Sequence, residues 1–503
     1  MKMALLCLCL ICVWLCLCPF SFSADAIAEP FDVRRHLSTV TRYDVSTSNL
    51  LSSSSSAPPI PNACQPIHLN LVARHGTRSP TKKRIKELDM LATRLASLLQ
   101  QATDNSSIPA WIPGWQSPWK GRLKGGELIT LGEEELYSLA LRVRHRFPQI
   151  FTKDYHPDLY PIKATQVPRA AASAVAFGTG LFSGKGTLGP GQHRAFSVVS
   201  ESRASDILLR FYDTCATYKG YRESHEPQVD KLKEPVLEEI TSALISRHGL
   251  NFKRQDVASL WFLCKQEASL LDITNQACGL FNETETHLLE WTDDLEVFLL
   301  KGYGKSINYW MGVPLLQDIF QTMQEAIRAN EENQPGGMYE RARLRFAHAE
   351  TIVPFSCLLG LFLEGDDYEK IQRSESLDLP PRPPQDRNWR GSSIAPFAGN
   401  NMLVLYQCHD EQKGQNSSYH VQVLHNEVPI SLPACGTDFC PFEVFKERVV
   451  LPLLKHEFNS ICDAKSVVRD VEAPKPCSWS CKFSNFLGGI FSSAQPQQEK
   501  SEL

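Results

Sequence analysis

Residues 74–80 carry the side chains needed to bind and attack a phosphoryl group. The guanidinium groups of Arg74 and Arg78 can each bind two phosphoryl oxygens. His75 lies between them, and imidazole is a competent nucleophile. We therefore interpret His75 as a nucleophile inside an anion-binding turn, and not as a structural histidine in a solvated basic loop. The segment reads Arg74-His75-Gly76-Thr77-Arg78-Ser79-Pro80.

Two later segments could complete such a site. Arg169 lies at a predicted helix start and could supply a third guanidinium, although an arginine there is usually only a surface residue. Glu350 could protonate the alkoxide that leaves when a phosphate ester breaks. A protonated His348 could stabilise the charge of the transferring phosphoryl group. A His-x-Glu sequence is common, and this one gains weight because the first segment needs an acid.

Each of these segments lies between a predicted strand and a predicted helix. Apolar residues over 67–73 predict a strand, and Ser79 and Pro80 predict the N-cap and first residue of a helix that reaches about residue 102. Ligands of open α/β sheets bind at the carboxyl ends of the strands, so the three turns are expected to meet at one edge. The other predicted elements are a strand over 159–165 with a helix from Pro168, a strand over 343–348 with a helix over 351–362, and late strands over 402–408 and 419–423.

Repeated strand–helix pairs predict an α/β fold with a mainly parallel central sheet flanked by helices. Helical spacing without strand signals predicts an α-helical insertion domain over 212–335. A polar stretch with a serine run precedes the core and is predicted to be flexible, with part of it docked. The predicted divisions are this leader over 24–61, a catalytic core over 62–211 and 336–465, the insertion, and a C-terminal tail over 466–503.

The composition of the 503-residue chain is that of a globular protein. Hydrophobic residues make up 43% and charged residues 21%, which argues against a wholly disordered, collagen-like or coiled-coil chain. The 52 basic and 56 acidic residues give a formal charge of −4. Because no overall basic surplus exists, nucleic-acid binding is not indicated, and any anion site must come from local clustering.

The N-terminus predicts export. An apolar run after Lys2 indicates a signal peptide over 1–23, with a signal-anchor helix as the alternative, and no later segment predicts a membrane span. Three glycosylation sequons agree with secretion. The last four residues resemble an ER-retrieval signal, so the protein is expected in the ER lumen or, if this tail is inactive, in a vacuole or outside the cell. The sequons begin at Asn105, Asn282 and Asn416, and the tail reads Lys500-Ser501-Glu502-Leu503.

The cysteines also fit an oxidising compartment. Five of the sixteen lie in the signal peptide, and most of the remaining eleven should pair. An odd number leaves at least one thiol free or paired between chains. We predict that Cys357, in an apolar helical run, is a buried free thiol and that Cys477 and Cys481 form a local disulfide. No spacing predicts a zinc site.

The catalytic segments resemble those of a known family. Residues 74–80 are similar to the Arg-His-Gly-x-Arg-x-Pro signature of the histidine acid phosphatases, and 393–397 resembles a further piece of that family. Most members pair the signature with a later His-Asp. The His348-Ala349-Glu350 sequence instead resembles the multiple inositol polyphosphate phosphatase branch, which includes phytases. The resemblance covers residues 64–465.

This resemblance implies a histidine-phosphatase-like fold and a two-step reaction. His75 would attack a phosphomonoester and form a phosphohistidine, while the phosphoryl oxygens are held by four side chains. Glu350 would protonate the leaving oxygen, and water would then hydrolyse the intermediate. No metal or cofactor is implied. The four oxygen-binding side chains would be those of Arg74, Arg78, Arg169 and His348.

A cluster of positive charge suggests the class of substrate. Lys82 and Lys83 follow the signature closely and could share a helix face above the catalytic turn. Charge beyond that needed for one phosphate suits a small molecule with several phosphates, such as inositol hexakisphosphate. The alternative is a solvated lysine face. The cluster comprises Arg74, Arg78, Lys82, Lys83, Arg84 and Lys86.

Other functions remain open at this point. The chain could be a broad-specificity acid phosphatase or a bisphosphoglycerate phosphatase, or a non-catalytic inositol-phosphate-binding protein. A phosphoglycerate-mutase-like enzyme also uses Arg-His-Gly, but its usual continuation lacks Arg78 and Pro80. The nucleophile and the candidate acid together favour an enzyme. The sequence indicates no oligomeric state.

Overall fold

The structure is a computed structural model that describes residues 30–53, 60–102, 106–332, 339–409 and 417–463. Every element discussed below belongs to the compact unit that begins at Val33. Several predicted features lie outside the described residues: the signal peptide, the sequons at Asn105 and Asn416, the Cys477–Cys481 pair and the C-terminal retrieval-like sequence.

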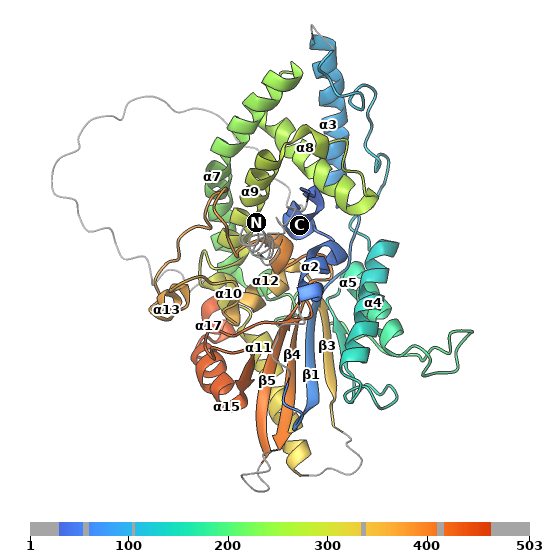
Figure 1. The fold of residues 1–503 in the computed structure, drawn as a ribbon, viewed down its shortest axis with the longest axis vertical. Helices are drawn as coiled ribbons and strands as arrows, with labels where there is room; N and C mark the ends of the chain where they lie inside the picture. Colours follow the sequence, from blue (N-terminus) through green and yellow to red (C-terminus); the bar gives the residue numbers. More distant parts are fainter. Residues whose placement is uncertain (1–29, 54–59, 103–105, 333–338, 410–416, 464–503) are drawn as a thin grey trace, which may run out of the picture. The chain divides into compact units, whose positions relative to one another are not determined.

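A seven-stranded mixed sheet organises the fold in the order β2-β3-β1-β4-β5-β6, with β7 paired to β5. Strands β2, β3 and β1 are parallel, whereas β4 and β5 continue the sheet in antiparallel fashion (Figure 1). The α/β fold class and the late strands are confirmed. The strands are β1 (Cys64–Arg74), β2 (Ile162–Ala164), β3 (Ala342–Ala347), β4 (Asn400–His409), β5 (Ser417–His425), β6 (Val428–Pro429) and β7 (Phe439–Pro441).

The register of the parallel strands brings three turns together. Arg74 of β1 pairs with Ala347 of β3, and Ala164 of β2 pairs with Phe346 one residue earlier. All three strands therefore end at the same level. Because parallel strands direct their carboxyl ends to one edge, the turns that follow them meet there, as the sequence predicts.

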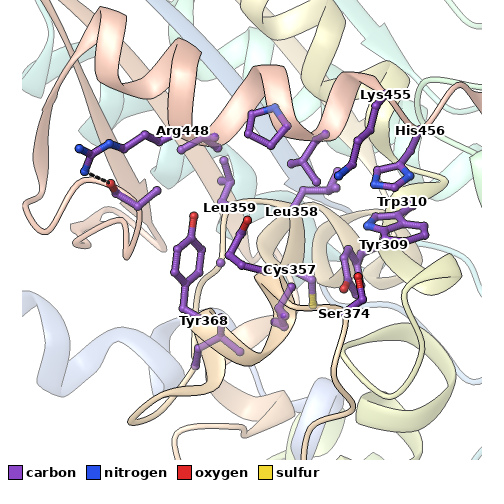
Figure 2. Close-up of a pocket in the computed structure, with 18 residues that line it drawn as sticks. Tyr309, Trp310, Cys357, Leu358, Leu359, Tyr368, Ser374, Arg448, Lys455 and His456 are labelled. Atoms are coloured by element: carbon purple, nitrogen blue, oxygen red, sulfur yellow. Dashed lines mark hydrogen bonds between the residues drawn. The ribbon is translucent and has the colours of Figure 1, made fainter.

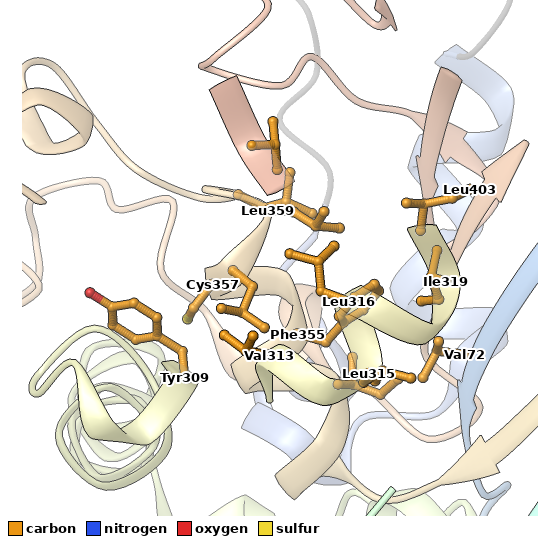
Figure 3. Close-up of a cluster of buried hydrophobic side chains, with 14 of the residues drawn as sticks. Val72, Tyr309, Val313, Leu315, Leu316, Ile319, Phe355, Cys357, Leu359 and Leu403 are labelled. Atoms are coloured by element: carbon orange, nitrogen blue, oxygen red, sulfur yellow. The ribbon is translucent and has the colours of Figure 1, made fainter. Parts of the chain in front are cut away.

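Helices cover both faces of the sheet. Side chains alternate between the faces of a strand, so Leu71 of β1 packs with α4 (Thr130–Arg146) and α5 (Pro168–Leu181). Val72 points the opposite way and packs with α11 (Val313–Glu331) and α12 (Ala349–Leu358). Figure 3 shows Val72 and Leu403 of the sheet beside Leu315 and Ile319 of α11. This packing anchors the two helices, α5 and α12, whose first turns carry site residues.

The chain between β2 and β3 is largely helical over the described part of residues 212–335, as predicted. Its helices α7 and α8 form a separate buried cluster with α3, which follows the catalytic turn, whereas its last long helix, α11, packs on the sheet. Figure 1 shows α3, α7, α8 and α9 together beyond the end of the sheet. The bounds are α3 (Lys82–Gln101), α6 (Phe211–Thr214), α7 (Ala216–His248), α8 (Arg254–Gln266), a π-helical turn (Glu267–Leu271), α9 (Glu283–Lys301) and α10 (Ile307–Trp310).

Part of the predicted leader is ordered against the core. It forms two short helical turns, Val33–His36 and Ser38–Val40, followed by α2 (Tyr43–Ser53). Leu37 is buried, and the hydroxyl of Ser38 donates a 2.8 Å hydrogen bond to Asp294 Oδ1 of α9. This stretch is therefore the part of the leader that docks on the core, because an apolar side chain and buried polar contacts hold it there.

Four disulfides connect the described cysteines, and Cys357 is a buried free thiol, as predicted. Cys357 lines a cavity that shares no residue with the cavity beside His75. Figure 2 shows Cys357 with Tyr309, Trp310 and His456. Within the described residues, no helix combines the length and apolar character needed to cross a bilayer. The disulfides are Cys64–Cys408, Cys215–Cys462, Cys264–Cys278 and Cys435–Cys440.

Candidate active site

A cavity opens at the carboxyl ends of the parallel strands and extends toward α8 and α9. The space inside it that water molecules can occupy is about 160 Å³. His75 lines it beside six cationic and three acidic side chains. The surplus of positive charge favours an anionic ligand. The cations are Arg74, Arg78, Arg84, Arg169, Lys265 and Lys301, and the acids are Asp293, Glu296 and Glu350.

A backbone contact sets the tautomer of His75. Its Nδ1 lies 2.9 Å from the carbonyl oxygen of Gly76. A carbonyl only accepts hydrogen bonds, so Nδ1 carries the proton and Nε2 keeps its lone pair. Burial, then the charges of Arg169 and Arg74, hold the pKa of His75 well below its usual value. The imidazole is therefore neutral, which is the nucleophilic form.

Close backbone packing fixes the turn behind His75. A Cβ on Gly76 would lie 2.2 Å from the carbonyl oxygen of Gly132 in α4, so only glycine fits. The amide of Gly76 donates to Ser173 Oγ at 3.1 Å. The buried carboxylate of Glu135 accepts from the Thr77 amide at 2.7 Å and from its hydroxyl at 2.8 Å. The sequence reading missed Glu135 because it lies 58 residues further along the chain.

Of the two arginines of the signature, Arg74 is buried and Arg78 is partly buried, and both have unused donors. Arg74 Nη1 donates to the carbonyl oxygens of Ala395, at 2.7 Å, and Thr39, and the guanidinium stacks 4.5 Å from the Phe397 ring centroid. The Nε atoms of Arg74 and Arg78 make no hydrogen bond to any described residue. Burial lowers the pKa of Arg74 to about 10 and that of Arg78 to about 9, and Arg169 contributes to both reductions. A bound dianion would offset the repulsion among these arginines and would accept hydrogen bonds from the unused donors.

His348 lies opposite His75, with their ring centroids 5.4 Å apart. Arg169 Nη2 lies 3.4 Å from its Nδ1, and Arg210 Nη1 lies 3.2 Å from its Nε2. Burial, followed by the charge of Arg169, lowers the pKa of His348 well below its usual value. The expected positive charge on this ring therefore requires a bound anion. Thr165 Oγ1 lies 2.9 Å from the same Nε2.

Arg210 was not predicted as a site residue. It precedes α6 and reaches His348 across 138 positions of sequence, while its other terminal nitrogen pairs with Asp213. An isolated arginine before a short helix has no distinctive sequence signal. Only the folded chain shows that it contacts the second histidine.

Glu350 lies in the first turn of α12 and forms an ion pair with Lys301, the last residue of α9. Glu350 Oε1 and Lys301 Nζ are 2.9 Å apart. Burial would raise the pKa of Glu350, but the charge and hydrogen bond of Lys301 outweigh burial and hold that pKa far below its usual value. The structure therefore presents the predicted acid as a carboxylate.

The lysines predicted to bind substrate do not line the cavity. Lys82 and Lys83 are exposed, whereas Arg84 of the same helical turn is a lining residue. The helix also begins later than predicted, because Thr81 is the N-cap of α3. Ser79 instead accepts the Gly126 amide at 3.0 Å and donates to Glu127 at 2.9 Å, which ties the catalytic turn to the loop before α4.

No group of three or more His, Cys, Asp or Glu side chains in the described ranges is arranged to hold a metal ion. Of the predicted glycosylation sites, Asn282 is exposed and is the N-cap of α9, where its Oδ1 accepts the Glu285 amide at 2.8 Å. Its Nδ2, the atom a glycan would modify, takes no part in that cap.

Known proteins are similar to this chain in sequence. Multiple inositol polyphosphate phosphatase 1 of Gallus gallus is 29% identical over 421 residues, covering 81% of this chain and 86% of the relative. The Homo sapiens protein of the same name is 27% identical, with 79% and 82% covered. A thiamine-repressible acid phosphatase of Schizosaccharomyces pombe is 24% identical, with 81% and 83% covered.

Solved structures show the same fold. The phytase from D. castellii superposes with a TM-score of 0.62 at 16% identity, covering 87% of this chain and 91% of that one. The Bifidobacterium longum multiple inositol polyphosphate phosphatase, in complex with inositol hexasulfate, gives 0.57 at 18% identity, with 83% and 98% covered. The family model of the histidine phosphatase superfamily (branch 2) matches residues 67–426. This chain belongs to that superfamily.

Proposed function

We propose that this chain removes phosphates from inositol polyphosphates such as phytate, through a phosphohistidine at His75. The observation that carries the proposal is a neutral, buried imidazole with Nε2 unprotonated, in a cavity that Arg74, Arg78 and Arg169 also line. Membership of the superfamily and the names of the most similar relatives support both the reaction and the substrate class.

In the first step, His75 Nε2 attacks the phosphorus atom as the ester P–O bond breaks. Arg74, Arg78 and Arg169 bind the phosphoryl oxygens, and preorganised cations of this kind supply a large part of catalysis. His348 gains positive character once the dianion is bound, and Arg210 holds its ring in place. Glu350, once protonated, gives its proton to the leaving oxygen.

In the second step, water attacks the phosphohistidine. The Glu350 carboxylate accepts a proton from this water while the P–N bond breaks and His75 is regenerated. The same residue therefore acts as acid and then as base. The 5.4 Å between the two imidazole centroids leaves both rings within reach of one phosphoryl group.

The test of this function is phosphate release from phytate by purified protein at mildly acid pH in the presence of a chelator. Products separated by ion exchange would show which phosphates leave. Phosphate release should disappear in His75→Ala, and rapid denaturation of the wild type during turnover should trap labelled phosphate on His75. Sustained phytate hydrolysis by His75→Ala would contradict the proposal.

A broad-specificity acid phosphatase is the second candidate, and the relatives named as acid phosphatases in Schizosaccharomyces pombe favour it. Comparing kcat/KM for phytate with that for simple monoesters separates the two. A preference for simple monoesters would favour the acid phosphatase.

We also propose that the protein works in the secretory pathway. The predicted signal peptide and the four disulfides support an oxidising compartment. Fusing a reporter with and without the last four residues tests retrieval. Loss of ER residence on deletion supports retention, and unchanged export supports a vacuolar or extracellular location.

A further inference from the structure

Three of the cations that line the cavity are already paired with carboxylates. Arg84 Nη1 lies 2.7 Å from Glu87 Oε2, and Lys265 Nζ lies 2.6 Å from Asp293 Oδ2. Lys301 Nζ lies 2.9 Å from Glu350 Oε1. A polyanionic substrate that binds these cations must compete with their carboxylates. In the Lys301–Glu350 pair, the carboxylate that the substrate would displace is also the proposed proton donor. This does not hold for the other two pairs.

The position of Lys301 suits an exchange of partners. It is the last residue of α9, its side chain is 14% exposed, and it lines the same cavity as His75. Glu350 is exposed to the same extent. The lysine stem can therefore swing from the carboxylate toward the open cavity. A phosphate dianion carries more charge than a carboxylate and makes charge-assisted hydrogen bonds, so it is a strong competitor for the ammonium group.

We propose that Lys301 is a positioning and specificity-determining residue that couples binding of a second substrate phosphate to proton delivery by Glu350. In the free enzyme Lys301 binds the carboxylate. A substrate phosphate next to the reacting one takes over Lys301 Nζ and releases Glu350 Oε1 toward the leaving oxygen. This inference rests on the proposed function and adds to it how the site distinguishes polyphosphates from monophosphates.

The proton balance follows from this exchange. Once Lys301 has left and a phosphate dianion lies nearby, Glu350 takes up one proton from solvent, because like charge favours its neutral form. The proton passes to the ester oxygen as the P–O bond breaks and the bond from His75 Nε2 to phosphorus forms. After the alcohol departs with its remaining phosphates, Lys301 returns to the carboxylate, and Glu350 is ready to accept the proton of the attacking water.

Other groups around Glu350 remain in place during the exchange. Glu350 interacts electrostatically with side chains from the turn after β1, from the start of α12, and from α6 and α7. Of the groups around it, Lys301 lowers the pKa of Glu350 most. The others are Arg74, Arg78, His348, Tyr212, Tyr218 and Arg222.

The test compares Lys301→Met with wild type on three substrates across a pH series. The substrates are phytate, an alkyl monophosphate with a poor leaving group, and p-nitrophenyl phosphate, whose leaving group needs no acid. For the alkyl monophosphate, loss of Lys301 should shift the basic limb of the kcat–pH profile to higher pH by about one unit or more. At a pH on that limb, kcat of the variant should then exceed that of the wild type by about tenfold. For phytate, kcat/KM should fall about tenfold. The burst of p-nitrophenol, which reports phosphorylation of His75 and needs no acid, should change much less than either of these values. A circular dichroism spectrum and an unfolding midpoint like those of the wild type show that the variant is folded.

Two control variants make the result specific. Lys301→Arg keeps a cation beside Glu350 and should keep the wild-type basic limb. Lys265→Met removes a cation of the same cavity whose partner, Asp293, is not the acid. It should weaken phytate turnover without moving the limb. Equal movement of the limb in Lys265→Met and Lys301→Met would overturn the proposal, as would an unmoved limb in Lys301→Met.

The two proposals fail in different ways. A wild-type enzyme that hydrolyses p-nitrophenyl phosphate but releases no phosphate from phytate contradicts the proposed substrate. A wild-type enzyme that hydrolyses phytate, with Lys301→Met reducing kcat for phytate and for the alkyl monophosphate equally at every pH, contradicts only the role of Lys301.

Discussion

The turns after β1 and after β3, which carry the predicted catalytic groups, differ in how the protonation states of those groups are set. After β1, the tautomer of His75 is set by its neighbour Gly76, whereas its low pKa depends on burial and on the charges of Arg169 and Arg74. After β3, the helix starts at once, and the states of His348 and Glu350 depend on Arg210, Arg169 and Lys301 from distant parts of the chain. Local backbone therefore sets the tautomer of His75, whereas burial and tertiary contacts set the charge states of both histidines and of Glu350.

The sharpest test of the first turn is removal of the nucleophile. His75→Ala should lower phosphate release from every substrate by about ten-thousand-fold or more, because no covalent intermediate can form. Binding of inorganic phosphate, measured by calorimetry, should persist because the arginines remain. Turnover retained within about a hundredfold would mean that the turn after β1 does not carry the nucleophile.

Removal of the acid should have an effect that depends on the substrate. Glu350→Gln should reduce kcat for phytate about a hundredfold to ten-thousand-fold, because the leaving oxygen loses its proton donor. Phosphorylation of the enzyme by p-nitrophenyl phosphate, measured as the burst of p-nitrophenol, should be much less affected. If the phytate and p-nitrophenyl phosphate bursts slow equally, Glu350 does not protonate the leaving group.

The rigidity of the first turn can be tested at Gly76. Gly76→Ala should lower the free energy of unfolding by about 1–3 kcal/mol and impair activity, because the new methyl group collides with the Gly132 carbonyl. The matched control is Gly220→Ala in α7, where nothing lies within 4 Å of an added Cβ. That change should be neutral or stabilising by about 0.5–1 kcal/mol. Chemical denaturation measures the free energy of unfolding of both variants. Equal values for Gly76→Ala and Gly220→Ala would show that the turn after β1 can shift to accommodate the added methyl group.

The reach of the second turn can be tested at Arg210. Arg210→Lys keeps the charge but loses the planar contact with His348, and should lower kcat about tenfold with little change in KM. The exposed Arg122, changed to lysine, is the control and should leave both parameters unchanged. A rise in KM without a fall in kcat would assign Arg210 to substrate binding instead.

The smallest effect is expected at the exposed lysines of α3. Exchanging both Lys82 and Lys83 for glutamine should raise KM for phytate by less than about threefold, because both lie outside the cavity and are screened by salt. Arg84→Gln should raise it more, since Arg84 lines the cavity. KM for phytate measured at low and high salt distinguishes the lysine double variant from Arg84→Gln. A larger increase in KM for the lysine double variant would mean that Lys82 and Lys83 bind substrate after all.

The nucleophilic turn and its flanking strand could be predicted because the information is local. An alternating apolar strand, a basic turn and a helix with regular leucines are all readable over about 40 residues. The helix start was placed at Ser79 and Pro80, whereas α3 begins at Lys82. Ser79 binds the loop before α4 instead of capping the helix, a contact 47 residues away that local patterns do not contain.

The sequence alone predicted which residues would carry the chemistry: a histidine between two arginines, and a later histidine and glutamate, each at the end of a strand. Only the tertiary structure decided their states. Glu350 is ionised because α9 places Lys301 beside it, and His348 is uncharged because burial and Arg169 disfavour its protonation. The physical reason is that residue type sets which proton transfers are available, whereas the pKa values depend on burial and neighbouring charges, which are known only when distant segments meet.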